Sequence, residues 1–124
     1  MAHSGPSQRQ LRVGEELRHA LSQTLQRGHF HDPVLFEAAS SLTVTEVRIS
    51  PDLKNATAYV MVLGGNGMDQ IIPALNEAAG HFQREVAHQM KMRFTPRLRF
   101  VIDESFDEAA KIESLLKSLP IPKD

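Results

Sequence analysis

A run of basic side chains between residues 81 and 102 is the part of the sequence best suited to bind an anion. This segment carries five Lys or Arg residues and one acidic residue, whereas the whole chain has a net charge of −1. Four side chains repeat at i, i+3, i+7 and i+10, the spacing of one helix face: His81, Arg84, His88 and Lys91. Because local potential steers association, this face predicts a polyanion partner. An ordinary solvated face is the alternative.

The remaining residues capable of chemistry do not form a recognisable catalytic or metal site. His29 and His31 share a short segment without a third ligand, and His81 and His88 lie too far apart along a helix to hold one ion. The sequence contains no P-loop, dinucleotide fingerprint or pairing of a nucleophile with a base. We therefore expect no metal, no cofactor and no enzymatic activity.

Composition is that of a small globular protein from a reducing compartment. The chain has 124 residues, of which 41% are hydrophobic, and it has no cysteine. No window approaches the length of a membrane span, and residues 1–10 lack the apolar core of a signal peptide. We expect one cytoplasmic domain over residues 1–124, with a core at about 9–119, flexible ends at 1–8 and 120–124, and no membrane partner.

Apolar periodicity predicts the order helix, strand, strand, helix, helix, strand, helix. The expected ranges are a helix at 9–27, strands at 41–49 and 56–63, two helices within 70–93, a strand at 97–103 and a helix at 106–118. A tight turn joins the first two strands, which excludes a parallel doubly wound sheet. The pattern instead predicts an α+β fold, with a three-stranded sheet and helices on one face.

Several local features refine these ranges. Gly28 should end the first helix, and the segment HFHDP, ending at Pro33, should be a loop. Asp69 is a candidate cap for a helix whose first turn contains Pro73. In the last strand, Ile102 should share the buried face with Leu98 and Phe100. Ser105 is a candidate cap for the final helix.

Gly80 interrupts a helix-forming stretch that runs from residue 74 to residue 94. Glycine in a helix interior costs about 1 kcal/mol relative to Ala, so the position should gain from a residue without a Cβ. We expect Gly80 to permit a sharp change of direction between two helices. It would also leave backbone N–H groups at the second helix start uncovered for a phosphate. A junction needed only for packing is the alternative.

Three stretches give the chain a resemblance to the ribosome-binding factor A family, whose members are bacterial assembly factors of the small ribosomal subunit. They are RQLRVGEELRHAL at 9–21, TVTEVRISPDLKNATAYVMVL at 43–63, and the segment from LNEAAG to ESLL at 75–116. The more specific parts are 50–53 and 93–105. The order of elements also matches a type II KH fold, which implies α-β-β-α-α-β with a C-terminal helix.

The resemblance implies binding to the free small (30S) subunit, and help with its late maturation and 16S rRNA processing, by a monomer. KH domains clamp nucleic acid with a GXXG loop, which the family replaces with an Ala-x-Gly kink, here Ala78 to Gly80. The expected RNA-binding residues, which should lie close together, are Ala78, Gly80, His81, Arg84, His88, Lys91, Arg93, Arg97 and Arg99. Gln83 departs from the family, which often has Arg at that position.

Two other classes of function remain open. A protein-interaction module without RNA binding would use exposed apolar positions and the acidic stretch 103–113, and its binding would depend little on salt. A metal-dependent enzyme would need the histidines, and metal analysis of the purified protein tests it.

Overall fold

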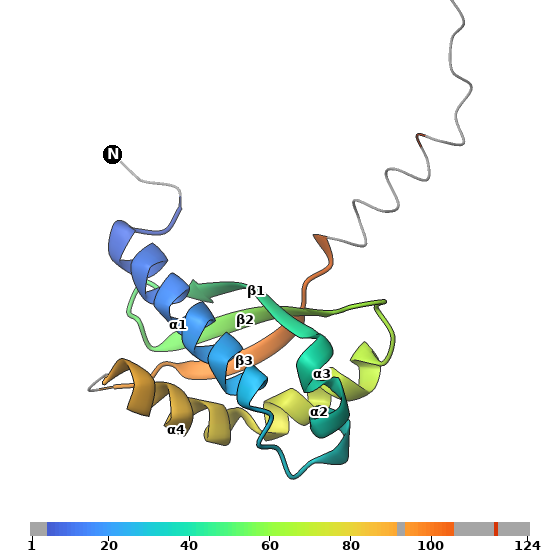
Figure 1. Ribbon diagram of the computed structural model, residues 1–124. Helices are drawn as coiled ribbons and strands as arrows, with labels where there is room; N and C mark the ends of the chain where they lie inside the picture. Colours follow the sequence, from blue (N-terminus) through green and yellow to red (C-terminus); the bar gives the residue numbers. More distant parts are fainter. Residues whose placement is uncertain (1–4, 92–93, 106–115, 117–124) are drawn as a thin grey trace, which may run out of the picture.

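The computed structural model describes residues 5–91, 94–105 and 116, and it has an α+β architecture (Figure 1). Its helices and strands follow the order α1, α2, η1, β1, β2, α3, α4 and β3. The helices are α1 (Gln8–Arg27), α2 (Pro33–Ala38), the short 3₁₀ helix η1 (Ala39–Ser41), α3 (Met68–Glu77) and α4 (Ala79–Met90). The strands are β1 (Leu42–Ile49), β2 (Asn55–Val62) and β3 (Arg97–Ile102). The expected helix at 106–118 falls almost entirely outside the described residues.

The three strands form one mixed sheet in the order β1-β2-β3. Strands β1 and β2 are antiparallel, as the tight turn between them requires, whereas β2 and β3 are parallel and are linked through α3 and α4. The register of β1 shifts between Val44 and Glu46, so Thr45 bulges out of the ladder. Its hydroxyl donates to the carboxylate of Asp103 and lies 3.2 Å from the carbonyl oxygen of Tyr59.

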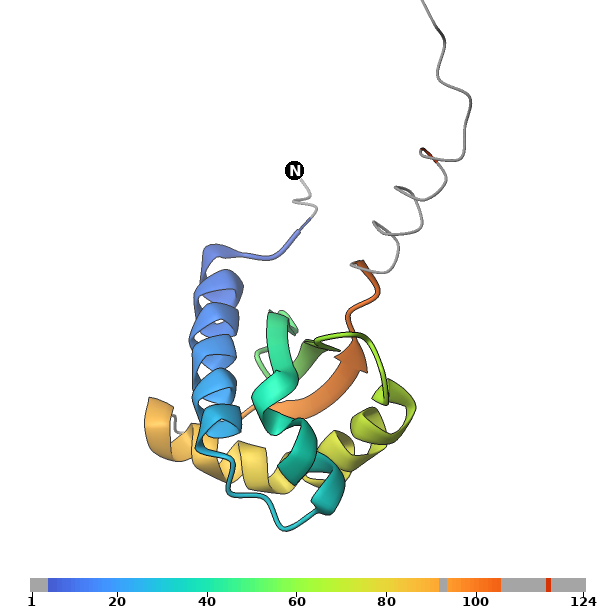
Figure 2. The same cartoon turned by 45° about the vertical axis from the view of Figure 1, so that its right-hand side comes forward.

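The helices α1, α3 and α4 cover one face of the sheet (Figures 1 and 2). The buried face of β2 carries small residues near the turn and larger ones further on, as expected: Ala56, Ala58, Val60 and Val62. Leu98 and Phe100 are buried on β3, but Ile102 is 37% exposed, so its expected burial is wrong. The alternation fails there because Ile102 is the last residue of the strand, at the rim of the core.

A glycine that the periodicity did not single out sets the distance between α1 and β1. A Cβ on Gly14 would lie 2.5 Å from the carbonyl oxygen of Val47, closer than real Cβ contacts. The helix ends where expected, at Gly28, whose left-handed conformation (φ 67°) suits glycine. The close approach of α1 to β1 at Gly14 leaves Leu17 and Leu21 completely buried.

The segment HFHDP is not wholly a loop, because Pro33 is the first residue of α2. Asp32 caps this helix, since its carboxylate accepts hydrogen bonds from the N–H groups of Val34 and Leu35.

The expected cap of α3 is wrong. That helix begins at Met68 after Gly67, so Asp69 lies within its first turn and Pro73 lies in its interior.

Two amide side chains close the outer edge of β3. The side chain of Asn76 accepts the N–H of Phe100 at 2.8 Å and donates to its carbonyl at 3.0 Å. The side chain of Gln83 accepts the N–H of Leu98 at 3.2 Å. These helix residues therefore satisfy backbone groups that an edge strand would otherwise leave unpaired.

Candidate nucleic-acid interface

The chain bends between α3 and α4 at Ala78, within the interval in which a break was expected. Ala78 has φ −87° and ψ 5°, which lies outside the helical region, and its N–H still donates to the carbonyl of Ala74. Gly80 is the second residue of α4 and has no positive φ. The bend itself is therefore at Ala78, and the expectation that Gly80 provides the change of direction is wrong.

Space around Gly80 is open in the part of the chain that the structure describes. A Cβ at this position would meet only Nη1 of Arg84 within 4 Å, at an ordinary 3.7 Å. The fold of the described residues thus gives no reason for the absence of a Cβ. A glycine that packing does not require is consistent with close approach of a partner.

Helix α4 is divided between a buried face and a basic face, as its periodicity predicts. Phe82 and Val86 are fully buried, and the ring of Phe82 lies 5.0 Å from that of Phe100. Arg84 and His88 are exposed on the other side of the helix.

Lys91 does not continue the helical spacing, although it is exposed. It is the C-cap of α4 and takes a left-handed conformation with φ 53°. The helix therefore ends three residues before the expected boundary at 93, and Arg93 itself lies outside the described residues. We call His81, Arg84, His88 and Lys91 the helix surface.

The expectation that Arg97 and Arg99 lie beside this helix surface is wrong. Both are exposed and alternate with the buried Leu98 and Phe100, so they project from the face of the sheet that the helices leave open. The alternation of β3 in the sequence shows that Arg97 and Arg99 share one face of the strand. Which face of the strand α4 covers depends on how β3 packs in the fold.

Arg97 and Arg99 belong to a second basic surface, which the sequence interpretation did not include. In the sheet register Arg48 and Arg99 flank Thr57, and the guanidinium of Arg48 lies 5.0 Å from the ring centroid of Tyr59. We call Arg48, Tyr59, Arg97 and Arg99 the sheet surface.

Arg48 lies between the apolar Val47 and Ile49, which was a local signal. Leu42 and Val44 fall on the same side of the alternation as Arg48, however, and only the bulge at Thr45 places all four apolar residues on one face.

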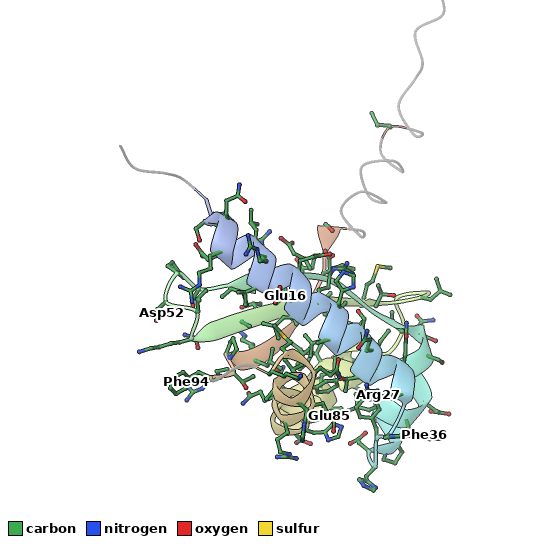
Figure 3. All side chains as sticks on the ribbon, turned by 60° about the vertical axis from the view of Figure 1, so that its left-hand side comes forward. Glu16, Arg27, Phe36, Asp52, Glu85 and Phe94 are labelled. Carbon is green, nitrogen blue, oxygen red and sulfur yellow. The ribbon has the colours of Figure 1, made fainter. Side chains whose placement is uncertain are left out.

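Most of the arginines on the two surfaces have no carboxylate partner among the described residues. The one acidic residue of α4, Glu85, contacts Arg27 of α1 at 3.5 Å, and Figure 3 shows Arg27 on α1 and Glu85 on α4. Arg84, Arg97 and Arg99 form no ion pair with any described residue. Arg48 pairs with the exposed Glu46 at 3.1 Å, and this contact raises its pKa.

The exposed apolar side chains bear on the alternative of a protein-docking module. Leu63 and Ile102, which are 84% and 37% exposed, line one pocket together with Met68. Phe36 and Phe94, which are 67% and 79% exposed, lie at opposite ends of the molecule (Figure 3). No described helix is long and apolar enough to cross a bilayer. Over the same residues, no three His, Cys, Asp or Glu side chains are close enough to share a metal ion.

Comparison with known proteins assigns the chain to a family. The model of the family described as ribosome-binding factor A matches residues 9–116. The chain belongs to the ribosome-binding factor A family. It is 52% identical over 121 residues to ribosome-binding factor A of Methylorubrum extorquens strain PA1, and the match covers 98% of this chain and 82% of the relative.

Solved structures of ribosome-binding factor A share the fold. The crystal structure of the Thermus thermophilus protein matches with a TM-score of 0.62 at 29% identity, over 75% of this chain and 94% of that chain. A Thermus thermophilus model fitted into a cryo-EM map of a complex with the 30S subunit matches with a TM-score of 0.58 at 26% identity, over 73% and 91% of the two chains. The expected KH-like α+β architecture is thereby confirmed.

The departure at Gln83 has a structural explanation in this member of the ribosome-binding factor A family. Its side-chain oxygen accepts the N–H of Leu98, so the amide faces the edge of β3. Gln83 therefore contributes to holding α4 against the sheet, and Arg84, the next residue, provides the exposed charge.

Proposed function

We propose that this protein binds the free small (30S) ribosomal subunit in the cytoplasm and assists its late maturation and 16S rRNA processing. It acts as a monomer without catalytic activity and docks its helix surface on ribosomal RNA. The observation that carries this proposal is the exposed Arg84, which has no ion-pair partner among the described residues, beside an unobstructed Gly80 at the bend where the family has its Ala-x-Gly kink.

The chemistry of the helix surface suits an RNA backbone. Arg84 presents a planar fork of donors that matches phosphate oxygens, and Lys91 adds a point charge at the end of α4. Contacts of this kind give affinity and orientation without reading sequence. Support for the ribosomal partner comes from family membership and from the Thermus thermophilus protein that was fitted into a 30S complex.

The sheet surface contributes in a different way. Because Arg97 and Arg99 project from the open face of the sheet, they contact a different stretch of RNA from the one that meets Arg84. We therefore assign them a second contact within the same particle.

Cosedimentation tests the proposed partner. The protein should pellet with free small subunits and not with complete ribosomes, because an assembly factor must leave before translation begins. Cells that lack the protein should accumulate precursor 16S rRNA, which northern blotting would detect. Equal recovery with both kinds of particle would argue against an assembly role.

A further inference from the structure

The loop between α1 and α2 forms a pocket with the start of α4, next to the bend at Ala78. The volume of this pocket is about 240 Å³. Residues from both segments line it, namely His29, Phe30, His31, Asp32, His81 and Arg84. The loop runs alongside the start of α4 in two views (Figures 1 and 2). We call this the histidine pocket.

Phe30 attaches the loop to the core and gives the pocket an aromatic wall. Its ring centroid lies 5.8 Å from that of His81 in an edge-to-face arrangement and 5.4 Å from that of the buried Phe82. Such ring pairs stabilise a fixed geometry. The flanking His29 and His31 lie at the rim, where their imidazoles are accessible.

The pocket offers one guanidinium to an anionic group of a ligand. Its one lining carboxylate, Asp32, is engaged by the N–H groups of Val34 and Leu35 at 2.8 and 3.3 Å. Arg84 has no ion-pair partner among the described residues. The three imidazoles do not form a metal-binding cluster within that part of the chain. The rest of the lining consists of four aromatic rings, the apolar Leu35 and Ala78, and one guanidinium.

We propose that the histidine pocket receives one unpaired RNA base, stacked on its imidazole and phenyl rings, with the adjacent phosphate against Arg84. Bases splayed out of single strands stack on Phe and His side chains in this way. At about 240 Å³ the pocket holds one base and not a run of stacked bases. A base inside a duplex cannot enter, because its two faces are covered by its neighbours. The inference rests on the proposed function, which supplies ribosomal RNA as the ligand.

The test uses the full chain, a single-stranded oligoribonucleotide of mixed sequence, and the same strand annealed to its complement. The double variant His29→Ala, His31→Ala removes two accessible rings and should leave the melting temperature unchanged. His19→Ala is the matched control, since His19 is a histidine on α1 with a side chain that is 64% exposed. Binding is measured by fluorescence anisotropy at one fixed salt concentration.

The double variant should bind the single strand about 5- to 160-fold more weakly, the range for loss of a stacked base. Its duplex binding should not change, and His19→Ala should behave like the unmodified protein. In NMR spectra of the unmodified protein, the single strand should shift the imidazole signals of His29, His31 and His81. Unaltered single-strand affinity in the double variant, or unmoved imidazole signals, would overturn the proposal.

The two proposals fail in different ways. If the unmodified protein does not bind small subunits, the proposed function is wrong, whatever the oligonucleotides show. If it binds small subunits and the double variant binds them and the single strand equally well, only the histidine pocket is refuted.

Discussion

The same substitution at two glycines should change stability in opposite directions. Gly80→Ala adds a methyl group where the structure leaves room, 3.7 Å from the flexible end of Arg84. Because the position is helical, Ala should raise the free energy of unfolding by about 0.5–1 kcal/mol. For a chain of this size, that gain raises the melting temperature by roughly 2–4 °C.

Gly14→Ala is the matched comparison, because this glycine is also helical but its Cβ would lie 2.5 Å from the carbonyl oxygen of Val47. A backbone atom cannot move aside as a side chain can, so α1 must shift away from β1. Overpacking of this kind costs about 1–3 kcal/mol, which exceeds the gain in helix propensity. We expect a net loss of stability.

Urea unfolding followed by circular dichroism gives both free energies of unfolding. A loss of more than about 1 kcal/mol for Gly80→Ala would show that the structure is wrong about the space around Gly80. If Gly80→Ala is stabilised yet binds small subunits more weakly, the glycine serves the partner and not the fold. Equal stabilisation at both glycines would refute the close contact between α1 and β1.

Three further outcomes are expected. Asn76→Ala should lower the free energy of unfolding by about 1–3 kcal/mol, as urea unfolding would show, because the N–H and carbonyl of Phe100 lose their partner. Hydrogen bonds from Ser105 and Thr45 lower the pKa of Asp103. The contribution of this carboxylate to the free energy of unfolding is therefore complete above the unfolded-state pKa of about 3.9, and it is lost as the pH falls through the lower folded-state pKa. The free energy of unfolding should therefore fall less between pH 6 and pH 2 in Asp103→Asn than in the unmodified protein. Charge reversal on the helix surface and on the sheet surface should weaken small-subunit binding additively in cosedimentation, and a combined variant no weaker than either parent would contradict separate contacts.

Local patterns were sufficient to predict most of the fold. Apolar spacing located α1 and the three strands, and Gly28 marked the end of α1. Helix α2 was missed because six residues are too few to show a period. Its signal was the pair Asp32 and Pro33, a cap followed by proline at the first helical position.

The candidate site could be predicted only in part, because it depends on how distant segments meet. The basic face of α4 follows from its own sequence, whereas the position of Arg97 and Arg99 depends on the docking of β3. The same holds for His29 and His31, which gain significance only when the loop packs beside His81. Gly14 likewise has no local signal, since its constraint comes from β1.

The most direct test of the account is the salt dependence of binding to purified free small subunits. The double variant Arg84→Glu, Lys91→Glu should keep the melting temperature of the unmodified protein and flatten the slope of log affinity against log salt by roughly 1 to 2 units. The control Arg9→Glu, Arg12→Glu makes the same change in net charge at exposed positions of α1 and should leave that slope nearly unchanged. If the Arg84 and Lys91 variant binds at low salt as tightly as the unmodified protein, the helix surface is only solvated surface and the account is contradicted.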